Sequence, residues 1–213
     1  MEKPIIATTV SGLFISNEPW KIAHKLGMEE LAKLSGDDSV LKATDSPDYF
    51  KKVESALEKI YPNLTPTERV IKRREIYFGR VLDLIKKNPQ FVNKEAIKYF
   101  STHKQNYRIA LITTNTKYFL EKVFAQMGIN LFDVIETSLP EEKDNKRLVF
   151  ERFLKKYGKP KVYVGGSKSD SYDFCKENNV PCIYANFYGD KDISGVQMAK
   201  NLEELEKLLG KIL

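Results

Sequence analysis

Three short apolar stretches of the chain end in small polar residues that could contact a ligand. They are Pro4–Glu18 (PIIATTVSGLFISNE), Ile109–Thr116 (IALITTNT) and Val162–Asp170 (VYVGGSKSD). β-Branched apolar runs of this length predict buried strands of a parallel sheet. Ligands of such sheets bind outside the carboxyl ends of the strands. The sequence therefore predicts a ligand site formed by the residues that follow these strands.

Hydroxyl side chains, rather than carboxylates, follow the first of these strands. Thr9 and Ser11 occupy this position, and the first aspartate in the chain is Asp37. A hydroxyl needs a neighbouring base before it can act as a nucleophile. Neither histidine, His24 or His103, is close in sequence, and their polar helical surroundings predict surface residues rather than metal ligands.

Helical periodicity fills the chain between the first strand and about residue 100, and strands alternate with helices from Tyr107 onward. Such alternation predicts right-handed βαβ units and a parallel sheet. We therefore predict an α/β core of residues 1–18 and 101–213, with residues 19–100 inserted as a helical cap domain. The predicted strands are Ile5–Thr9, Ile109–Thr113, Val134–Thr137, Val162–Val164 and Pro181–Ala185.

Local signals mark the ends of several predicted helices. Ser46-Pro47 is typical of a helix start, and Thr65-Pro66-Thr67-Glu68 has the pattern of a capping box. Gly128 and Gly158 are placed to end helices, and Asn201 to cap the last one.

The composition is that of an ordinary soluble globular protein, with 42% hydrophobic and 30% charged residues. The absence of a long apolar run or a signal-peptide pattern predicts a cytoplasmic location and no membrane partner. Cys175 and Cys182 are too few for a disulfide framework. Two buried thiols are the favoured interpretation, and a local disulfide is the alternative. The net charge of +6 permits contact with anions.

A basic run lies within the longest predicted helix, from Arg69 to Arg80 (RVIKRREIYFGR). Its basic side chains would face outward if the apolar residues between them face inward. A solvated helix face is one interpretation. The other is a surface for a nucleic acid, an anionic substrate or an acidic protein, formed by Arg69, Lys72, Arg73, Arg74 and Arg80.

These stretches, in this order, resemble the haloacid dehalogenase-like (HAD) phosphatase superfamily, in the branch with a helical cap after the first strand. Ile109–Thr116 is similar to the second motif of that family, an apolar strand ending in Thr-Asn. Val162–Asp170 is similar to the fourth motif, a strand followed by Gly-Asp-Ser-x-x-Asp. Gly128–Ile135, Val180–Tyr184 and Asn201–Leu209 are similar to intervening and final segments, so the resemblance covers nearly the whole chain. It implies a Rossmann-like parallel core with an inserted all-α cap.

The chain departs from that family at its acidic residues. The family's first strand ends in Asp-x-Asp-Gly-Thr-Leu, whose first Asp attacks phosphorus and whose second is the general acid and base. Aligned on the glycine of that motif, Thr9 stands at the nucleophile position and Ser11 at the acid–base position. Gly166 replaces the first Asp of the fourth motif. The phosphoaspartyl mechanism needs a carboxylate nucleophile and carboxylate-bound Mg²⁺. No cofactor is therefore expected, and Mg²⁺ would require a rebuilt site with Asp170 as a candidate ligand.

The resemblance implies that phosphate-binding residues are retained. Thr114 and Asn115 match the position that hydrogen-bonds phosphate in the family, although capping of the strand end is an alternative role. The third-motif lysine corresponds to Lys143 or, in a competing register, to Lys146. Ser167 would add a donor at a helix N-terminus, where Asp170 is also placed to stabilise the first turn.

These features support three hypotheses for function. The leading one is a catalytically inactive HAD-like protein that binds a phosphate-containing or other anionic ligand in the cleft between cap and core. The second is a hydrolase of altered mechanism that uses Thr9, Ser11 or a bound water. The third is an interaction module that binds a nucleic acid or an acidic protein through the basic cap helix.

Overall fold

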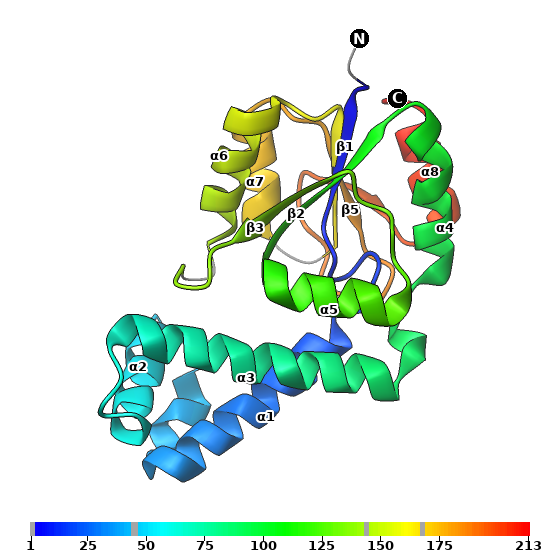
Figure 1. Cartoon of the computed structure of the whole chain (residues 1–213). Helices are drawn as coiled ribbons and strands as arrows, with labels where there is room; N and C mark the ends of the chain where they lie inside the picture. The colour runs from blue at the N-terminus through cyan, green and yellow to red at the C-terminus, as the bar shows by residue number, and fades with distance from the viewer. Residues whose placement is uncertain (1–2, 44–46, 143–144, 167–168) are drawn as a thin grey trace. The chain divides into compact units, whose positions relative to one another are not determined.

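The computed structural model describes residues 3–43, 47–142, 145–166 and 169–213. The chain divides into two compact units (Figure 1). The α/β unit comprises Met1–Asn17, Pro89–Leu139 and Asp144–Leu213, and the helical unit comprises Glu18–Asn88 and Pro140–Lys143. The predicted cap extended to residue 100, whereas the helical unit ends at Asn88. The difference arises because Phe100 is buried in the hydrophobic core of the α/β unit.

A six-stranded parallel sheet forms the centre of the α/β unit, as the α/β prediction required. Its strand order is β3-β2-β1-β4-β5-β6. The strands are β1 (Ile5–Thr8), β2 (Arg108–Thr116), β3 (Val134–Ser138), β4 (Val162–Gly165), β5 (Cys182–Ala185) and β6 (Gln197–Ala199). The three-residue β6 was not predicted, because so short a segment carries no periodic signal. Thr8 of β1 lies opposite Leu111 of β2 and Val164 of β4, so the residues that follow these strands lie at one edge of the sheet.

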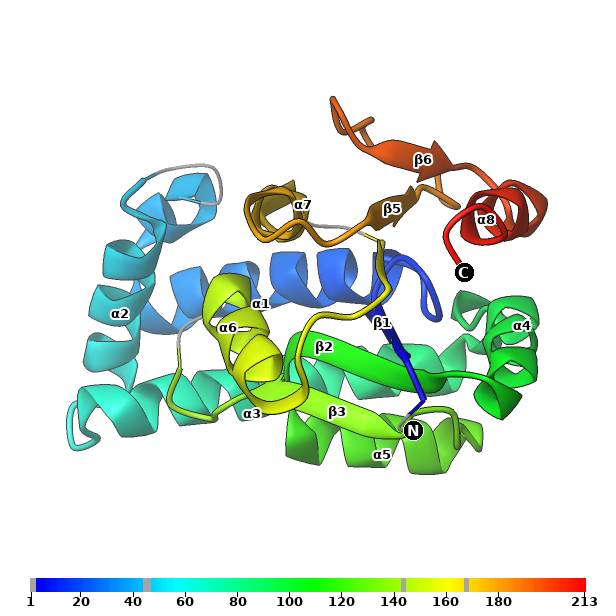
Figure 2. The ribbon, with the colours of Figure 1, turned by 90° about the horizontal axis from the view of Figure 1, so that it is seen from above.

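The α-helices in the described part of the α/β unit are α4 (Lys94–Thr102), α5 (Lys117–Met127), α6 (Lys146–Tyr157), α7 (Ser169–Glu177) and α8 (Leu202–Leu209). Figure 2 shows α6 and α7 on one side of the sheet and α4 and α8 on the other. The strand side chains alternate accordingly. Ile5 belongs to one hydrophobic cluster and Ile6 to the other. The predicted cap of α8 is confirmed, since the Asn201 side chain accepts a hydrogen bond from the backbone of Glu204 at 2.9 Å.

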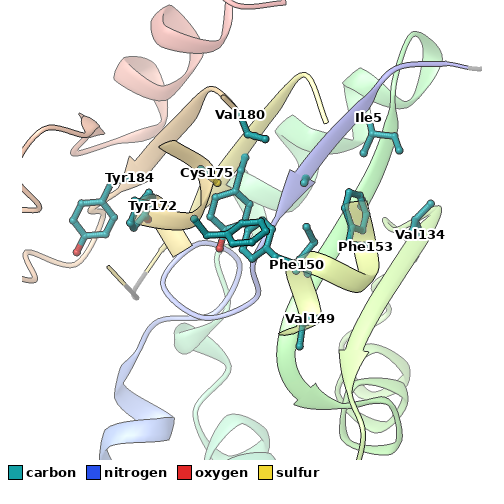
Figure 3. Packing of buried hydrophobic residues seen from close by; sticks show 14 residues of the cluster. Ile5, Val134, Val149, Phe150, Phe153, Tyr172, Cys175, Val180 and Tyr184 are labelled. Carbon is teal, nitrogen blue, oxygen red and sulfur yellow. The ribbon is translucent and has the colours of Figure 1, made fainter. Parts of the chain in front are cut away.

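Aromatic side chains fill the space between the sheet and α6 and α7 (Figure 3). The ring of Phe150 packs edge-on against Tyr163 and at a tilt against Phe174, with centroids 4.8 and 5.1 Å apart. Full burial of each large apolar side chain stabilises the fold by about 1.5–3 kcal/mol. Cys175 and Cys182 are free thiols in this cluster. Cys175 is buried as predicted, Cys182 is half-buried, and their mutual hydrogen bond raises the pKa of Cys175.

The helical unit consists of α1 (Glu18–Ser35), a 3₁₀ helix η1 (Asp38–Ala43), α2 (Tyr49–Ile60) and α3 (Pro66–Lys87). The capping box at Thr65 is confirmed: its hydroxyl accepts from the backbone N–H of Glu68, whose carboxylate accepts from the backbone N–H of Thr65. The Thr65 hydroxyl also donates to the Glu68 carboxylate at 2.7 Å, and this bond, with the one from the Thr65 backbone, lowers the pKa of Glu68. The predicted cap at Ser46 lies outside the described residues, and Asp48 precedes α2 without a capping bond. Within the described ranges, no helix has the length and apolarity to cross a bilayer.

His103, predicted to be a surface residue, is half-buried between tyrosine rings in the 3₁₀ helix η3 (His103–Gln105). Its ring centroid lies 4.9 Å from that of Tyr99 and 6.2 Å from that of Tyr107. Its Nε2 atom is buried and has no hydrogen-bond partner among the described residues. Burial lowers the pKa of His103, and the negative charge of Glu206 opposes this effect.

We expect His103 to make the protein less stable in mild acid. Its folded-state pKa lies below the unfolded value of 6.5, so the unfolded chain binds the proton more tightly, and stability falls as the pH drops below 6.5. His103→Gln should remove part of this fall, and Glu206→Gln should enlarge it. Urea unfolding midpoints between about pH 5.5 and about pH 7.5 would measure both effects. Parallel pH profiles for the wild type and His103→Gln would contradict this account.

Candidate functional site

The loops that follow β1 and β4 touch through their backbones at Gly12 and Gly166. A Cβ atom on Gly166 would lie 2.4 Å from the carbonyl oxygen of Ser11 and 2.4 Å from the carbonyl carbon of Gly12. A Cβ atom on Gly12 would lie 2.1 Å from the carbonyl oxygen of Gly166, and the φ angle of Gly12 is +76°. Only glycine fits at either position, so the close approach of the two loops depends on both residues.

Asn17 connects the loops that follow β1, β4 and β5. Its Nδ2 donates to the carboxylate of Asp190 at 2.6 Å and to the carbonyl oxygen of Gly166 at 3.4 Å. Asn186, directly after β5, donates to the backbone carbonyl of Asp190 at 2.8 Å. Neither residue was predicted as a site residue. Asn186 directly follows the predicted strand Pro181–Ala185 and could have been found from that position, whereas Asn17 lies eight residues beyond the predicted strand Ile5–Thr9.

Thr9 lies directly after β1 and is buried, with its backbone N–H donating to the carbonyl of Val164 at 3.2 Å. Its side chain forms a hydrogen bond with the hydroxyl of Tyr163, which also forms one with Ser171. Burial raises the pKa of Tyr163, so this phenol is neutral near neutral pH. The hydroxyl at the nucleophile position therefore contacts a neutral phenol that cannot act as its base.

Ser11, at the acid–base position, is half-buried in a tight loop. This loop is closed by a hydrogen bond of 2.7 Å from the backbone N–H of Gly12 to the carbonyl of Ile15, and Ser11 pairs with Ile15 in a short parallel bridge. A serine hydroxyl does not exchange protons efficiently near neutral pH. The loop geometry fixes Ser11 without giving it acid–base chemistry.

Thr114 and Asn115 lie near the end of β2, at the same sheet edge as Thr9. The pairing of β2 with β3 is irregular between Thr113 and Thr116, so the two residues leave the regular ladder. Asn115 is buried, and its backbone N–H donates to the hydroxyl of Thr113 at 3.1 Å. Thr114 is half-buried.

Lys146 is the first residue of α6 and is buried, with 4% of its surface exposed. Its ammonium group donates to the backbone carbonyl of Ile112 in β2 and lies 5.6 and 5.9 Å from the ring centroids of Phe150 and Tyr163. Tyr163 thus contacts Lys146 through its ring and Thr9 through its hydroxyl. The other two predicted anion-binding residues, Lys143 and Ser167, lie outside the described residues.

Asp170 is exposed in the first turn of α7, where a carboxylate stabilises the helix N-terminus. Mg²⁺ prefers several carboxylate and carbonyl oxygens in octahedral arrangement. No group of three or more His, Cys, Asp or Glu side chains in the described ranges could hold a metal ion. The carbonyl of Gly166 already accepts a hydrogen bond from Asn17. Among the described side chains, Asp170 thus belongs to no acidic group that could hold a metal ion.

The basic side chains of α3 are mostly held by partners inside the helical unit. Arg69 does not face solvent, contrary to the outward-facing arrangement that we predicted: it is buried and donates to the carbonyl of Leu64 at 2.9 Å. It is buried because it follows the capping turn and folds back onto it. Arg73 donates to the hydroxyl of Tyr49, Arg74 to backbone carbonyls of Pro140 and Glu142, and Arg80 pairs with Glu30. Lys72 is exposed.

No protein-family model and no curated protein matches this sequence. Solved structures match it over nearly its whole length. A HAD phosphatase from Thermococcus onnurineus is 18% identical with a TM-score of 0.59, covering 99% of this chain and 98% of that one. β-Phosphoglucomutase from Clostridium difficile is 15% identical with a TM-score of 0.59, with coverages of 99% and 98%. Protein tyrosine kinase A from Mycobacterium tuberculosis is 15% identical with a TM-score of 0.60, with coverages of 99% and 100%.

These matches establish the architecture that the motif order predicted. The names of the three proteins describe a phosphatase, a mutase and a kinase, so this architecture alone does not specify an activity. Sequence identities below one fifth do not extend the likeness to individual functional residues. The chain has the HAD-like fold.

Proposed function

We propose that this protein is a non-catalytic HAD-like protein whose strand-end loops bind a phosphate-containing or other anionic ligand. The observation that carries the proposal is the contact between the hydroxyls of Thr9 and Tyr163. Through this hydrogen bond, the Thr9 hydroxyl at the nucleophile position is paired with the neutral phenol of Tyr163. The further prediction that the ligand also touches the helical unit stays a prediction.

The alternative of a rebuilt hydrolase needs a base for Thr9 or Ser11. Tyr163 does not supply one, because burial raises its pKa and leaves it protonated near neutral pH. At the position where the family has its acid–base aspartate, this chain has Ser11, in the loop after β1. A water nucleophile would need a carboxylate or a metal beside it. No group of three or more acidic, His or Cys side chains in the described ranges could hold a metal, and the nearby Asp190 carboxylate already accepts a hydrogen bond from Asn17.

The proposed anion site keeps a lysine but lacks the carboxylates of the family motifs at positions 9, 11 and 166. The buried ammonium of Lys146 contacts the β2 backbone at Ile112. Asn115, nearer the end of the same strand, lies where the hydrogen-bonding register with β3 is irregular. An anion there would meet a buried charge in a low-dielectric environment, where electrostatic attraction is strong. Thr114, Lys143 and Ser167 remain the proposed additional donors.

We expect no release of phosphate from a panel of phosphomonoesters, with Mg²⁺ or with chelator. Thr9→Ala and Ser11→Ala should behave like the wild type, because neither hydroxyl has a base. A colorimetric phosphate assay with an active HAD phosphatase as positive control would measure this. Turnover that Thr9→Ala or Ser11→Ala abolishes, while the melting temperature is unchanged, would establish the altered mechanism instead.

Restoring the missing carboxylates should fail for a steric reason. Thr9→Asp with Ser11→Asp still lacks the third acid, and adding Gly166→Asp forces a Cβ atom into the backbone of Gly12. Overpacking of this kind costs about 1–3 kcal/mol. We expect the melting temperature of the triple variant to drop by roughly 5 °C or more.

Gly166→Ala separates the steric effect of Cβ from the charge of the new aspartate. Gly210→Ala is the matched control in the same unit, since a Cβ atom there meets only ordinary contacts and the backbone is helical. Gly166→Ala should be destabilised, and Gly210→Ala should not. Equal melting temperatures for the two single variants would show that the loops separate easily. Mg²⁺-dependent turnover by the triple variant would show that the scaffold still accepts the family's mechanism.

Inorganic phosphate or a phosphomonoester should raise the melting temperature, because a ligand that binds only the folded state stabilises it. Lys146→Met, which keeps the side-chain volume but removes the charge, should weaken phosphate binding about tenfold. Lys94→Met, at an exposed position of the same unit, is the control. Calorimetric titration with phosphate in chelator would measure the affinities. Equal phosphate affinities for the wild type and Lys146→Met would show that Lys146 does not contribute to phosphate binding.

A further inference from the structure

The excess positive charge of the chain belongs to the α/β unit. This unit contains 20 basic and 15 acidic residues, whereas the helical unit contains 15 and 14. Residues 152–161 (RFLKKYGKPK), which form the end of α6 and the connection into β4, include five basic residues and no acidic one. This basic segment therefore belongs to the α/β unit, whereas the basic run predicted as an interaction surface belongs to the helical unit.

The lysines of this segment differ in how they are neutralised. Lys156 pairs with the buried carboxylate of Glu136 at 2.9 Å. Lys155, Lys159 and Lys161 are exposed and form no ion pair with any residue that the structure describes. Their charges are therefore available to an anionic partner.

The sheet topology places two further basic residues, Arg108 and Lys3, at the same edge of the sheet as Lys161. The backbone N–H of Lys161 donates to the carbonyl of Ile5 at 2.8 Å, and that of Arg108 donates to the carbonyl of Pro4 at 2.9 Å. Lys161 and Arg108 thus flank the start of β1, and Lys3 is exposed just before it. Figure 1 shows the start of β1 and the end of α6 together at the top of the α/β unit. This is the amino edge of the sheet, opposite to the strand ends discussed above.

An exposed aromatic side chain lies among these charges. Tyr157, the last residue of α6, is 37% exposed, and the guanidinium of Arg108 lies 6.0 Å from its ring centroid. Arg–aromatic pairs of this kind are recurrent platforms for unpaired bases, because every base can stack on them.

Helix stabilisation explains only part of the pattern. Lys155 and Lys156 lie in the last turn of α6, where cations interact favourably with the helix dipole. Lys159 and Lys161 lie beyond the helix end, and Lys3 lies on a different segment. Their convergence is not required by the dipole of α6.

We infer that the amino edge of the sheet is a binding surface for single-stranded nucleic acid. Lys3, Arg108, Lys155, Lys159 and Lys161 contact the phosphates, and Tyr157 stacks on a base. A duplex would offer phosphates but no unpaired base to Tyr157. This inference does not rest on the proposed function, because the two surfaces lie at opposite edges of the sheet.

The test is fluorescence anisotropy of a labelled oligothymidylate with the full chain, at several salt concentrations. Lys155→Glu/Lys159→Glu/Lys161→Glu should weaken binding at least tenfold at low salt. The slope of log affinity against log salt should fall by about 2, since each phosphate contact on a single strand contributes about 0.7. The matched control is Lys25→Glu/Lys33→Glu/Lys51→Glu, which changes the net charge equally at exposed positions of the helical unit outside the basic run of α3.

Tyr157→Leu separates base stacking from general attraction to anions. It should weaken oligothymidylate binding several-fold while leaving the salt slope unchanged. Absence of wild-type binding at low salt, or equal losses in the two triple variants, would overturn the inference. The inference would also be overturned if Tyr157→Leu bound oligothymidylate like the wild type and polyglutamate competed as well as unlabelled oligothymidylate. The surface would then be a general polyanion site.

Discussion

The backbone contact between Gly12 and Gly166 sets the geometry of the strand-end site. It brings the loop after β1 against the loop after β4, two segments whose strands are neighbours in the sheet. Asn17 links the same two loops by donating to Gly166, and it joins them to the loop after β5 by donating to Asp190. A side chain at either glycine would have to displace backbone, which is far less adaptable than another side chain. The loss of an acid at position 166 is therefore built into the packing of the loops.

The chemistry of the site follows from this closure and from the polarity of what remains. Thr9 contacts the neutral hydroxyl of Tyr163, and the ring of Tyr163 lies beside the buried ammonium of Lys146. These three side chains come from the residue after β1, from β4 and from α6, and they form one connected group. The group can donate hydrogen bonds and attract negative charge, but it contains no base near neutral pH. Binding without turnover is the function that such a group supports best.

Much of the fold could be predicted because its signals are local. The capping box at Thr65 and the cap at Asn201 depend on residues within four positions of each other, and both are confirmed. The features that sequence did not reveal depend on distant partners. The sequence showed that Gly166 replaces an aspartate of the family motif. It did not reveal the backbone contact with Gly12, because the two residues are far apart in the chain. The buried Arg69 side chain likewise reaches Glu58 of α2, eleven positions earlier, at 3.6 Å, besides the nearby carbonyl of Leu64.

The central claim is that the nucleophile position cannot form a covalent intermediate, although the site holds an anion. Mass spectrometry of the intact protein, incubated with a phosphomonoester and Mg²⁺, tests both parts when spectra are recorded under native and denaturing conditions. The account predicts a phosphate-bearing adduct in the native spectrum that disappears on denaturation. A phosphoryl group that survives denaturation and maps to Thr9 or Ser11 would contradict it.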